Sequence, residues 1–232
     1  MKKKAGLSSL SLAISAIALV SVGAQADDFY CAETLGMDYE YENIIVPYGA
    51  HCKLEGTKVK GNVMVKHGGA LWTYEAMIDG NIEAYGPEYM KINASYVDGN
   101  IDITKTTDVP EAGFPNEICE SKVGGNIELY ENYAPYDVGC EDGNHVYGNI
   151  KIEKNYIAKD FGTPYAINVA YNKVKGNIQF NDNMSDYGEF NIYKNYINGN
   201  LECYGNYPYP IGGGNTVYGN AEGQCYDLVD MY

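Results

Sequence analysis

The sequence predicts an all-β fold, a single-stranded parallel β-helix (β-solenoid) of about 8–9 coils that is capped and disulfide-pinned at its ends. Two observations indicate the coils: a Val/Ile-x-Gly-Asn-aliphatic motif recurs along the chain, and apolar residues alternate with polar ones around it. A third observation, an even set of six cysteines, indicates how the coils are joined. The anchor asparagines of the motif, each expected at a structural corner, are Asn62, Asn81, Asn100, Asn126, Asn149, Asn177, Asn200 and Asn220.

The spacing of the anchor asparagines sets the size of the repeat. Subtracting consecutive residue numbers gives 19, 19, 26, 23, 28, 23 and 20 residues. Repeats of this length are too short for the blades of a β-propeller and lack the Leu-x-x-Leu-x-Leu pattern of leucine-rich repeats. They fit one coil of a parallel β-solenoid, in which neighbouring coils lie ~4.8 Å apart.

Each repeat contains a short strand that begins directly after the anchor asparagine. The residues one and three positions after the anchor are mostly apolar, as in Ile127 and Leu129, and the residue between them is mostly charged, as in Glu128. This period of two places one face of the strand in the core and the other in water. A second strand precedes the corner, with inward positions such as Ile92 and Ile192.

The Gly-Asn pair is expected to bend the chain, because glycine permits the positive φ of a corner and asparagine tolerates it better than most residues. A second recurring feature of the repeat lies five residues before each anchor, where small or polar side chains can stack and hydrogen-bond along the axis. These residues are Thr57, Ala76, Ser95, Ser121, Asn144, Asn172, Asn195 and Asn215.

Three segments are expected along the chain. Residues 1–26 have the pattern of a bacterial-type signal peptide, with three lysines, an apolar run over residues 7–22 and an Ala-Gln-Ala cleavage site. Residues 27–42 would form an N-terminal cap, and residues 43–232 the β-helix domain with its C-terminal cap. The mature chain would then be secreted or periplasmic, with no insertion into the membrane.

The charge of the mature chain excludes one class of partner. Without the three lysines of residues 1–26 it would keep 13 lysines (16 minus 3) against 31 acidic residues, a formal charge of −18. The sequence contains no arginine. So acidic a protein repels the phosphates of nucleic acid, and we expect no nucleic-acid partner.

The six cysteines are expected to form disulfides, because an even set is typical of exported proteins. Taken as neighbours they are separated by 21, 21 and 22 residues, close to one repeat. Six cysteines allow 15 pairings, and the repeat favours the one that joins adjacent coils. The pairs are Cys31 with Cys52, Cys119 with Cys140, and Cys203 with Cys225.

Acidic residues in phase are candidate ligands of Ca²⁺, the one ion for which the sequence offers a site. Like charges stacked one coil apart are costly unless they are compensated, and Ca²⁺ could compensate them. Water and splayed side chains would also suffice, and we favour this simpler interpretation. The candidate residues are Asp79, Glu83, Asp98, Asp102 and Glu128.

Tyrosine is unusually abundant, with 24 residues against a single tryptophan. Exposed tyrosines suit stacking on carbohydrate or contact with protein, since each combines an apolar ring with a hydroxyl. The alternative is that they reflect only the β-propensity of a solvated strand. The outward-facing candidates for binding are Tyr85, Tyr130, Tyr147, Tyr204 and Tyr218.

The repeat resembles known bacterial solenoids. The pattern Val174-Lys175-Gly176-Asn177-Ile178 is similar to the repeat of bactofilins, and the end over residues 200–225 is similar to that of secreted bacterial β-helix proteins closed by cysteines. The resemblance covers residues 43–225 and implies a right-handed parallel β-helix. Bactofilins are cytosolic and do not rely on disulfides, so the signal peptide and the cysteines argue against a cytoskeletal role.

Two functions from different classes fit these features. We favour an exported, non-enzymatic β-solenoid that serves as a surface, periplasmic or matrix protein and binds polysaccharide or a cell-surface protein. The alternative is a polysaccharide-active lyase or glycoside hydrolase with a Ca²⁺-assisted carboxylate site. No catalytic residue can be assigned from the sequence.

Overall fold

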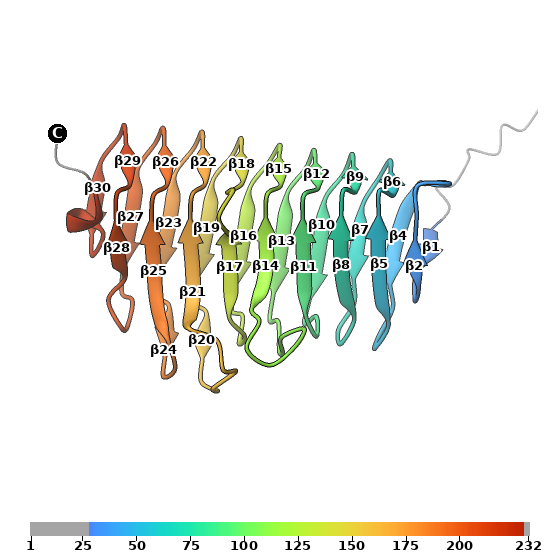
Figure 1. The fold of residues 1–232 in the computed structure, drawn as a ribbon, viewed down its shortest axis with the longest axis horizontal. Coiled ribbons are helices and arrows are strands. Elements are labelled where there is room, and N and C mark those ends of the chain that lie inside the picture. Colours follow the sequence, from blue (N-terminus) through green and yellow to red (C-terminus); the bar gives the residue numbers. More distant parts are fainter. Residues whose placement is uncertain (1–27, 230–232) are drawn as a thin grey trace, which may run out of the picture.

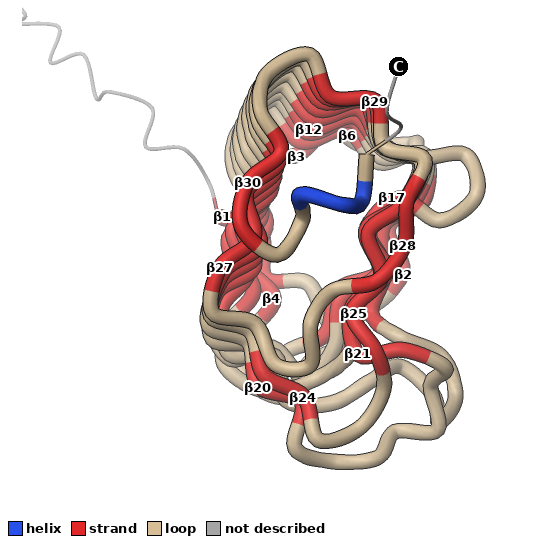
Figure 2. The backbone as a smooth tube through the Cα atoms, turned by 90° about the vertical axis from the view of Figure 1, so that its left-hand side faces the viewer, coloured by secondary structure: helices blue, strands red, loops and turns tan. Residues whose placement is uncertain are grey.

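Three parallel β-sheets extend along one common axis and form a β-solenoid of about ten turns (Figure 1). The computed structural model describes residues 28–229, so the expected signal peptide, residues 1–26, lies outside the described residues. Each turn contributes one strand to sheet A, one to sheet B and one to sheet C, which surround a common core (Figure 2). The predicted all-β parallel solenoid is therefore confirmed.

Sheet A contains the strand that follows each anchor asparagine, and sheets B and C contain the two strands that precede it. The strands of sheet A are β1 (Asp28–Tyr30), β4 (Asn43–Val46), β7 (Val63–Val65), β10 (Ile82–Tyr85), β13 (Ile101–Thr104), β16 (Ile127–Tyr130), β19 (Ile150–Glu153), β23 (Ile178–Asn181), β27 (Leu201–Tyr204) and β30 (Ala221–Gly223). Those of sheet B are β2 (Thr34–Leu35), β5 (His51–Glu55), β8 (Ala70–Tyr74), β11 (Met90–Asn93), β14 (Asn116–Cys119), β17 (Tyr136–Gly139), β21 (Tyr165–Ala170), β25 (Glu189–Tyr193) and β28 (Ile211–Gly213). Those of sheet C are β3 (Glu40–Tyr41), β6 (Lys58–Val59), β9 (Met77–Ile78), β12 (Tyr96–Val97), β15 (Lys122–Val123), β18 (His145–Val146), β22 (Lys173–Val174), β26 (Tyr196–Ile197) and β29 (Thr216–Val217).

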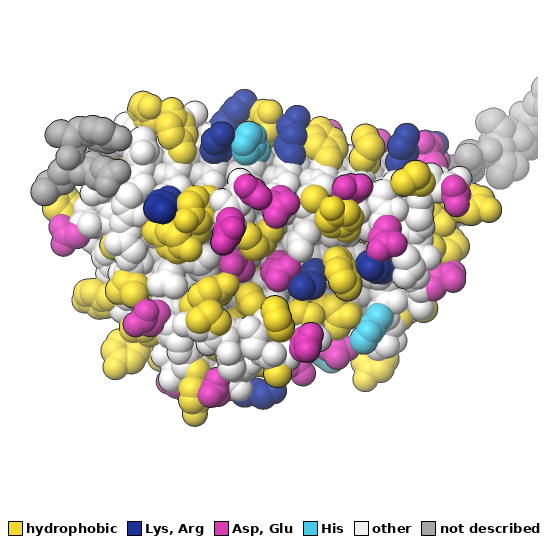
Figure 3. All heavy atoms as spheres, in the orientation of Figure 1, with side chains coloured by type: hydrophobic (Ala, Val, Ile, Leu, Met, Phe, Trp, Pro, Cys, Tyr) yellow, Lys and Arg dark blue, Asp and Glu magenta, His cyan; other side chains and the backbone are white. Residues whose placement is uncertain are grey.

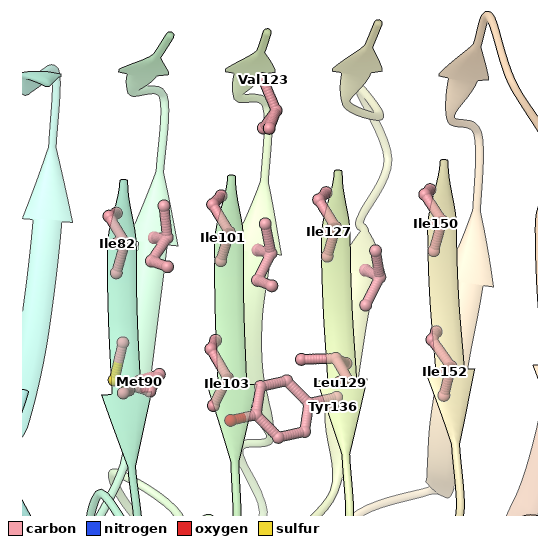
Figure 4. Packing of buried hydrophobic residues seen from close by; sticks show 14 of the residues in the cluster. Ile82, Met90, Ile101, Ile103, Val123, Ile127, Leu129, Tyr136, Ile150 and Ile152 are labelled. Carbon is pink, nitrogen blue, oxygen red and sulfur yellow. The ribbon is translucent and has the colours of Figure 1, made fainter. Parts of the chain in front are cut away.

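The register of the sheets follows the phase of the repeat. Ile82, Ile101 and Ile127 are direct partners on adjacent strands of sheet A, and the same column continues through later coils. Figure 4 shows this column beside a second one that contains Ile103 and Leu129. All of these side chains are buried, so the period-two alternation of the sequence becomes a continuous apolar core.

The two ends of the described chain are built differently. Within the expected N-terminal cap, residues 27–42, the segment 28–41 supplies β1, β2 and β3 and so forms a short first coil. At the other end the 3-10 helix η1 (Tyr226–Leu228) crosses the open end of the coil (Figure 2). Its Leu228 is buried against the core, so this end is covered.

All three predicted disulfides are present. Cys31 pairs with Cys52, Cys119 with Cys140, and Cys203 with Cys225. The Cα atoms of each pair lie 5.3–5.5 Å apart, because residues about one repeat apart in sequence lie on adjacent coils. Two of the bridges fix the terminal coils and one joins two central coils.

The predicted role of the Gly-Asn pair is wrong in one respect. None of its glycines has a positive φ. Left-handed residues instead lie six positions before each anchor, where most are not glycine, such as Glu75, Ala94 and Tyr171, and a second set lies five positions after most anchors. The glycine is needed because the coils approach closely: a Cβ on Gly80 would lie 2.5 Å from the backbone oxygen of Gly61. The glycine of this motif is therefore a packing requirement and not a turn residue.

The anchor asparagines form a hydrogen-bonded ladder along the solenoid. The backbone N–H of Asn81 donates to Oδ1 of Asn62 at 2.8 Å, and the other anchors repeat this contact. The row five residues before the anchors forms a second ladder, as predicted, in which Ser121 N–H donates to Oδ1 of Asn144 at 2.9 Å. Both ladders satisfy backbone groups at corners where the strands are interrupted.

A third ladder, not predicted from the sequence, lies at the corner where sheet A ends. It consists of Thr106, Asn132, Asn155, Asn183, Asn206 and Gln224. The four asparagines stand six residues after an anchor and are buried. Beyond this corner the longest loops connect sheet A to sheet B, at the lower edge in Figure 1, where β20 (Tyr156–Ile157) and β24 (Met184–Ser185) form a small sheet of their own.

Candidate binding face on sheet C

Each coil presents two outward side chains on sheet C. The inward residue three positions before the anchor is buried, as in Val146 and Val174, so the residues that flank it face solvent. Because the strands pair in register, the residues four positions before the anchors form a row along the axis. This row is Lys58, Met77, Tyr96, Lys122, His145, Lys173, Tyr196 and Thr216.

Basic and aromatic side chains gather on one half of this sheet. We call this surface the sheet C face, defined as Tyr96, Lys122, His145, Tyr147, Lys173, Lys175, Tyr196 and Tyr218. Figure 3 shows lysine, histidine and hydrophobic side chains side by side along the upper edge of the molecule, where the strands of sheet C lie. The rest of the surface in this view carries most of the acidic groups.

Tyr147 lies between two lysines. The Nζ atom of Lys175 is 3.9 Å from the ring centroid of Tyr147, and that of Lys122 is 5.4 Å from it. Lys122 also lies 5.1 Å from the ring of Tyr96. These cation–π contacts hold the lysines beside the rings without neutralising them, so each lysine keeps its charge for a ligand.

The lysines of the sheet C face stand apart from the ion pairs of the described part of the chain. Among residues 28–229 the ion pairs involve other lysines, and none contains Lys122, Lys173 or Lys175. An open hollow of about 220 Å³ lies beside them, and its lining includes His145, Tyr147 and both Lys173 and Lys175. The face therefore combines positive charge, exposed rings and a concavity.

A tyrosine pair ends the face on the C-terminal side. The rings of Tyr196 and Tyr218 have centroids 5.2 Å apart, and the hydroxyl of Tyr196 donates to that of Tyr218 at 2.8 Å. This hydrogen bond raises the pKa of Tyr196. Both rings are more than two-fifths exposed, so they offer apolar surface to a ligand.

The five tyrosines predicted as binding residues fall in two places. Tyr147 and Tyr218 belong to the sheet C face, whereas Tyr85, Tyr130 and Tyr204 lie in one outward row of sheet A. On sheet A they are separated from one another by intervening coils. Each is engaged by a charged neighbour. Two different lysines donate from Nζ to the hydroxyls of Tyr85 and Tyr130, each at 3.1 Å, and the hydroxyl of Tyr204 donates to a glutamate at 2.9 Å.

The five acidic residues predicted as Ca²⁺ ligands are also divided between two sheets. Glu83, Asp102 and Glu128 are direct neighbours on sheet A, as expected from their phase. Burial, together with the charges of Glu128 and Glu83, raises the pKa of Asp102. Lys151 donates to Glu128 at 2.8 Å and so supplies a compensating charge from within the chain.

The other two predicted ligands, Asp79 and Asp98, lie beside the N-terminal end of the sheet C face. Tyr96 donates its hydroxyl to Asp98 at 2.6 Å. Among the described residues the one group of three close ligand atoms joins Asp137 to Cys119 and Cys140, whose sulfurs form a disulfide and are not free to ligate. Ca²⁺ binding by the predicted acidic rows stays a prediction.

A buried carboxylate on sheet B was missed by the sequence analysis. Asp137 is 9 % exposed, accepts hydrogen bonds from Tyr165 at 2.6 Å and Asn168 at 2.9 Å, and neighbours Glu117 on the next strand. Burial raises the pKa of Asp137, although these hydrogen bonds and that from Cys140 N–H oppose the shift. So little exposure leaves no room for a substrate, and we assign Asp137 a structural role.

Asp137→Asn is expected to remove part of the pH dependence of stability. The raised pKa means that the folded chain binds this proton more tightly than the unfolded chain, so the favourable contribution is present at low pH and is lost as pH rises through the folded pKa. Asparagine does not ionise. Urea unfolding at a series of pH values above the ordinary pKa of 3.8 should show wild type losing stability relative to the variant, and parallel curves would contradict this assignment.

Trp72 on sheet B is the main competing aromatic site. It is 39 % exposed, and the Nζ atoms of Lys53 and Lys91 lie 4.1 and 5.5 Å from its ring. Both lysines are paired with acids, Lys53 with Glu55 at 2.6 Å and Lys91 with Glu117 at 3.3 Å. Their charge is therefore already compensated, and we place this site behind the sheet C face.

Sequence reasoning found two tyrosines of the face and missed the basic row. The signal was the residue four positions before each anchor, where Lys122, His145 and Lys173 stand in successive repeats. The direct pairing of these three residues on neighbouring strands turns that periodicity into a surface.

Comparison with protein-family models, with curated proteins and with solved structures finds no match to this chain. Within residues 28–229 the structure contains no helix of the length and apolar character needed to cross a membrane.

Proposed function

We propose that the protein is an exported, non-enzymatic β-solenoid that binds polysaccharide along the sheet C face. The observation that carries the proposal is the position of Tyr147, an exposed ring held between two lysines that form no ion pair within the described residues. Tyrosine rings stack on the apolar faces of sugars, and the hydroxyl and lysine groups can bond to sugar oxygens.

The shape of the face suits an extended ligand. Neighbouring coils repeat every ~4.8 Å, which is comparable to the length of one sugar unit, so successive coils could contact successive sugars. The row is straight because its residues are direct partners across parallel strands. A linear polymer can therefore lie along the solenoid axis and contact several coils at once.

Export is supported by the disulfides. Three bridges and no free cysteine among the described residues are typical of an oxidising, extracellular compartment. Secretion through the signal peptide and a bacterial origin belong to this proposal. Enzymatic activity on polysaccharide is the alternative, and we place it second because the predicted acidic residues lie on two different sheets.

Tyr147→Ala is expected to weaken polysaccharide binding about fivefold, since an aromatic contact contributes about 1 kcal/mol and 1.4 kcal/mol corresponds to a factor of ten. The affinity of the mature protein for a panel of neutral and acidic polysaccharides can be measured by calorimetry. The same mixtures should be assayed for reducing ends and unsaturated products.

Tyr85→Ala is the matched control, because Tyr85 is also exposed and also has a lysine near its ring, but lies on sheet A. We expect its affinity to equal that of wild type. Equal loss in both variants, or binding to none of the polysaccharides, would contradict the proposal, and release of products would favour the enzyme.

A further inference from the structure

We infer that the ligand of the sheet C face is an anionic polysaccharide, one whose sugars carry carboxylate or sulfate groups. The inference rests on the proposed function and narrows it from polysaccharides in general to a single chemical class. It is argued from the placement of positive charge on a chain whose formal charge is −15.

The positive charge is concentrated on adjacent coils. Lys122, His145 and Lys173 are direct partners on β15, β18 and β22, and Lys175 lies two residues beyond Lys173. Lys122 and Lys173 are thus two strand spacings apart, ~10 Å along the axis. A polymer that carries an anion on successive sugars could place one beside each of these coils.

The tyrosines accompany the cations along the same line. Tyr147 lies between Lys122 and Lys175, and Tyr196 follows Lys173 on the next strand. A ligand on this line would therefore meet a ring and a cation on neighbouring coils. Sugars that carry an anion offer both a face for the ring and a charge for the lysine.

Acidic residues limit the site. Asp79 and Asp98 occupy the outward row on the N-terminal side. Glu120 and Asp142 line a second hollow together with Lys122 and His145. These carboxylates repel an anion, so the polymer should run towards Tyr196 and Tyr218 and away from Asp98. The same carboxylates would also repel a flexible polyanion whose charges came to lie beside them.

Among the lysines of residues 28–229 outside the sheet C face, most form an ion pair, whereas Lys122, Lys173 and Lys175 form none there. Lys53, Lys60, Lys91 and Lys151 each bond to a carboxylate of the protein itself. A lysine without such a partner can give its full interaction to a ligand anion, with no internal ion pair to break. Exposed charge pairs are screened by salt, so the binding should weaken as ionic strength rises.

The test compares one polymer with and without its charge. Calorimetry with alginate and with alginate whose carboxyl groups have been esterified holds the backbone constant and changes only the anion. We expect wild type to bind the free acid at least tenfold more tightly than the ester, and to lose affinity with added salt.

Variants then locate the charge that is responsible. The triple variant Lys122→Gln, Lys173→Gln, Lys175→Gln should lose at least tenfold in affinity for alginate. The control triple variant Lys66→Gln, Lys154→Gln, Lys194→Gln removes the same charge from exposed lysines outside the sheet C face and should bind within about twofold of wild type.

The outcomes separate the inference from the proposed function. Equal affinity for alginate and its ester, or an unaffected sheet C triple variant, would overturn the anionic ligand while the effect of Tyr147→Ala could still uphold polysaccharide binding. Binding of polyglutamate as tightly as alginate would also overturn it, because the partner would then be an acidic polypeptide. Loss of alginate affinity only in the sheet C triple variant, with weak polyglutamate binding, is the result that supports it.

Discussion

Replacing Asn155 by alanine is expected to lower the free energy of unfolding by about 3–5 kcal/mol, because unsatisfied buried polar groups each cost about 1–3 kcal/mol. The side chain of Asn155 is 1 % exposed and belongs to the third ladder. Its Oδ1 accepts from the backbone N–H of Asn132 at 2.8 Å, and its Nδ2 donates to the carbonyl of Leu129 at 3.1 Å. Alanine would leave the backbone N–H of Asn132 buried without this partner and would remove one hydrogen bond from the carbonyl of Leu129, which also lies in the ladder of β16 with β19.

The loss should spread beyond one coil. Asn155 also donates to Oδ1 of Asn183 at 2.8 Å and accepts from Nδ2 of Asn132 at 2.9 Å, so it links the asparagines on either side. Hydrogen-bonded chains in a low-dielectric interior are worth more than the sum of their pairs. Urea unfolding of wild type and variant measures the difference directly.

Asn198→Ala is the matched control for this prediction. Asn198 is exposed on sheet C, and its backbone N–H bonds to Val174 O independently of the side chain. Its replacement should change the free energy of unfolding by less than about 0.5 kcal/mol. If Asn155→Ala were as mild as this control, the third ladder would not hold the coils together.

Gly148→Ala is expected to destabilise the solenoid by at least about 3 kcal/mol, the upper range for overpacking a tight interior. A Cβ on Gly148 would lie 2.6 Å from the carbonyl oxygen of Gly125 and closer still to Oδ1 of Asn126. Neither can withdraw freely, since Gly148 N–H bonds to Gly125 O at 3.0 Å and Asn149 N–H bonds to Asn126 Oδ1 at 2.8 Å. Thermal and urea unfolding would measure the effect.

Gly36→Ala separates close approach from the general effect of losing a glycine. Gly36 has no positive φ, and a Cβ there would meet nothing within 4 Å. Its replacement should be neutral or slightly stabilising, by up to about 1 kcal/mol, because alanine restricts the unfolded chain. Equal destabilisation by both substitutions would show that contact between coils is not the reason for the Gly-Asn motif.

The columns of the core and the disulfides could be predicted because they depend on phase alone. A parallel stack with fixed spacing places Ile82 beside Ile101, and Cys119 beside a cysteine about one repeat later, whatever the loops do. The alternation of apolar residues defined the inward face of sheet A. These features needed no knowledge of the corners.

The corners were predicted less well because two physical causes select glycine. Positive φ and close approach both favour it, and the sequence does not say which applies. Here close approach selects the glycine of Gly-Asn, and positive φ falls on residues such as Glu75 and Tyr171. The third ladder was missed because its asparagines stand in only four successive repeats, with Thr106 at the corresponding place in the coil before them.

The candidate site was predicted only in part because outward residues are not constrained by the core. Tyr147 and Tyr218 were recognised as outward, but neither hydropathy nor spacing ranks them above Tyr85 or Tyr130. The difference lies in the neighbours from adjacent coils, which the register of sheet C supplies. A binding face on a solenoid is assembled across repeats and is not visible within any one of them.

The most direct test of the account is oxidative footprinting of the tyrosines in the presence and absence of alginate. The exposed tyrosines on all three sheets act as built-in reporters, read out by mass spectrometry after proteolysis. We predict protection of Tyr147, Tyr196 and Tyr218 on sheet C, with Tyr85, Tyr130 and Tyr204 on sheet A oxidised as fast as in the free protein. Protection on sheet A, around Trp72 on sheet B, or nowhere would contradict a binding face on sheet C.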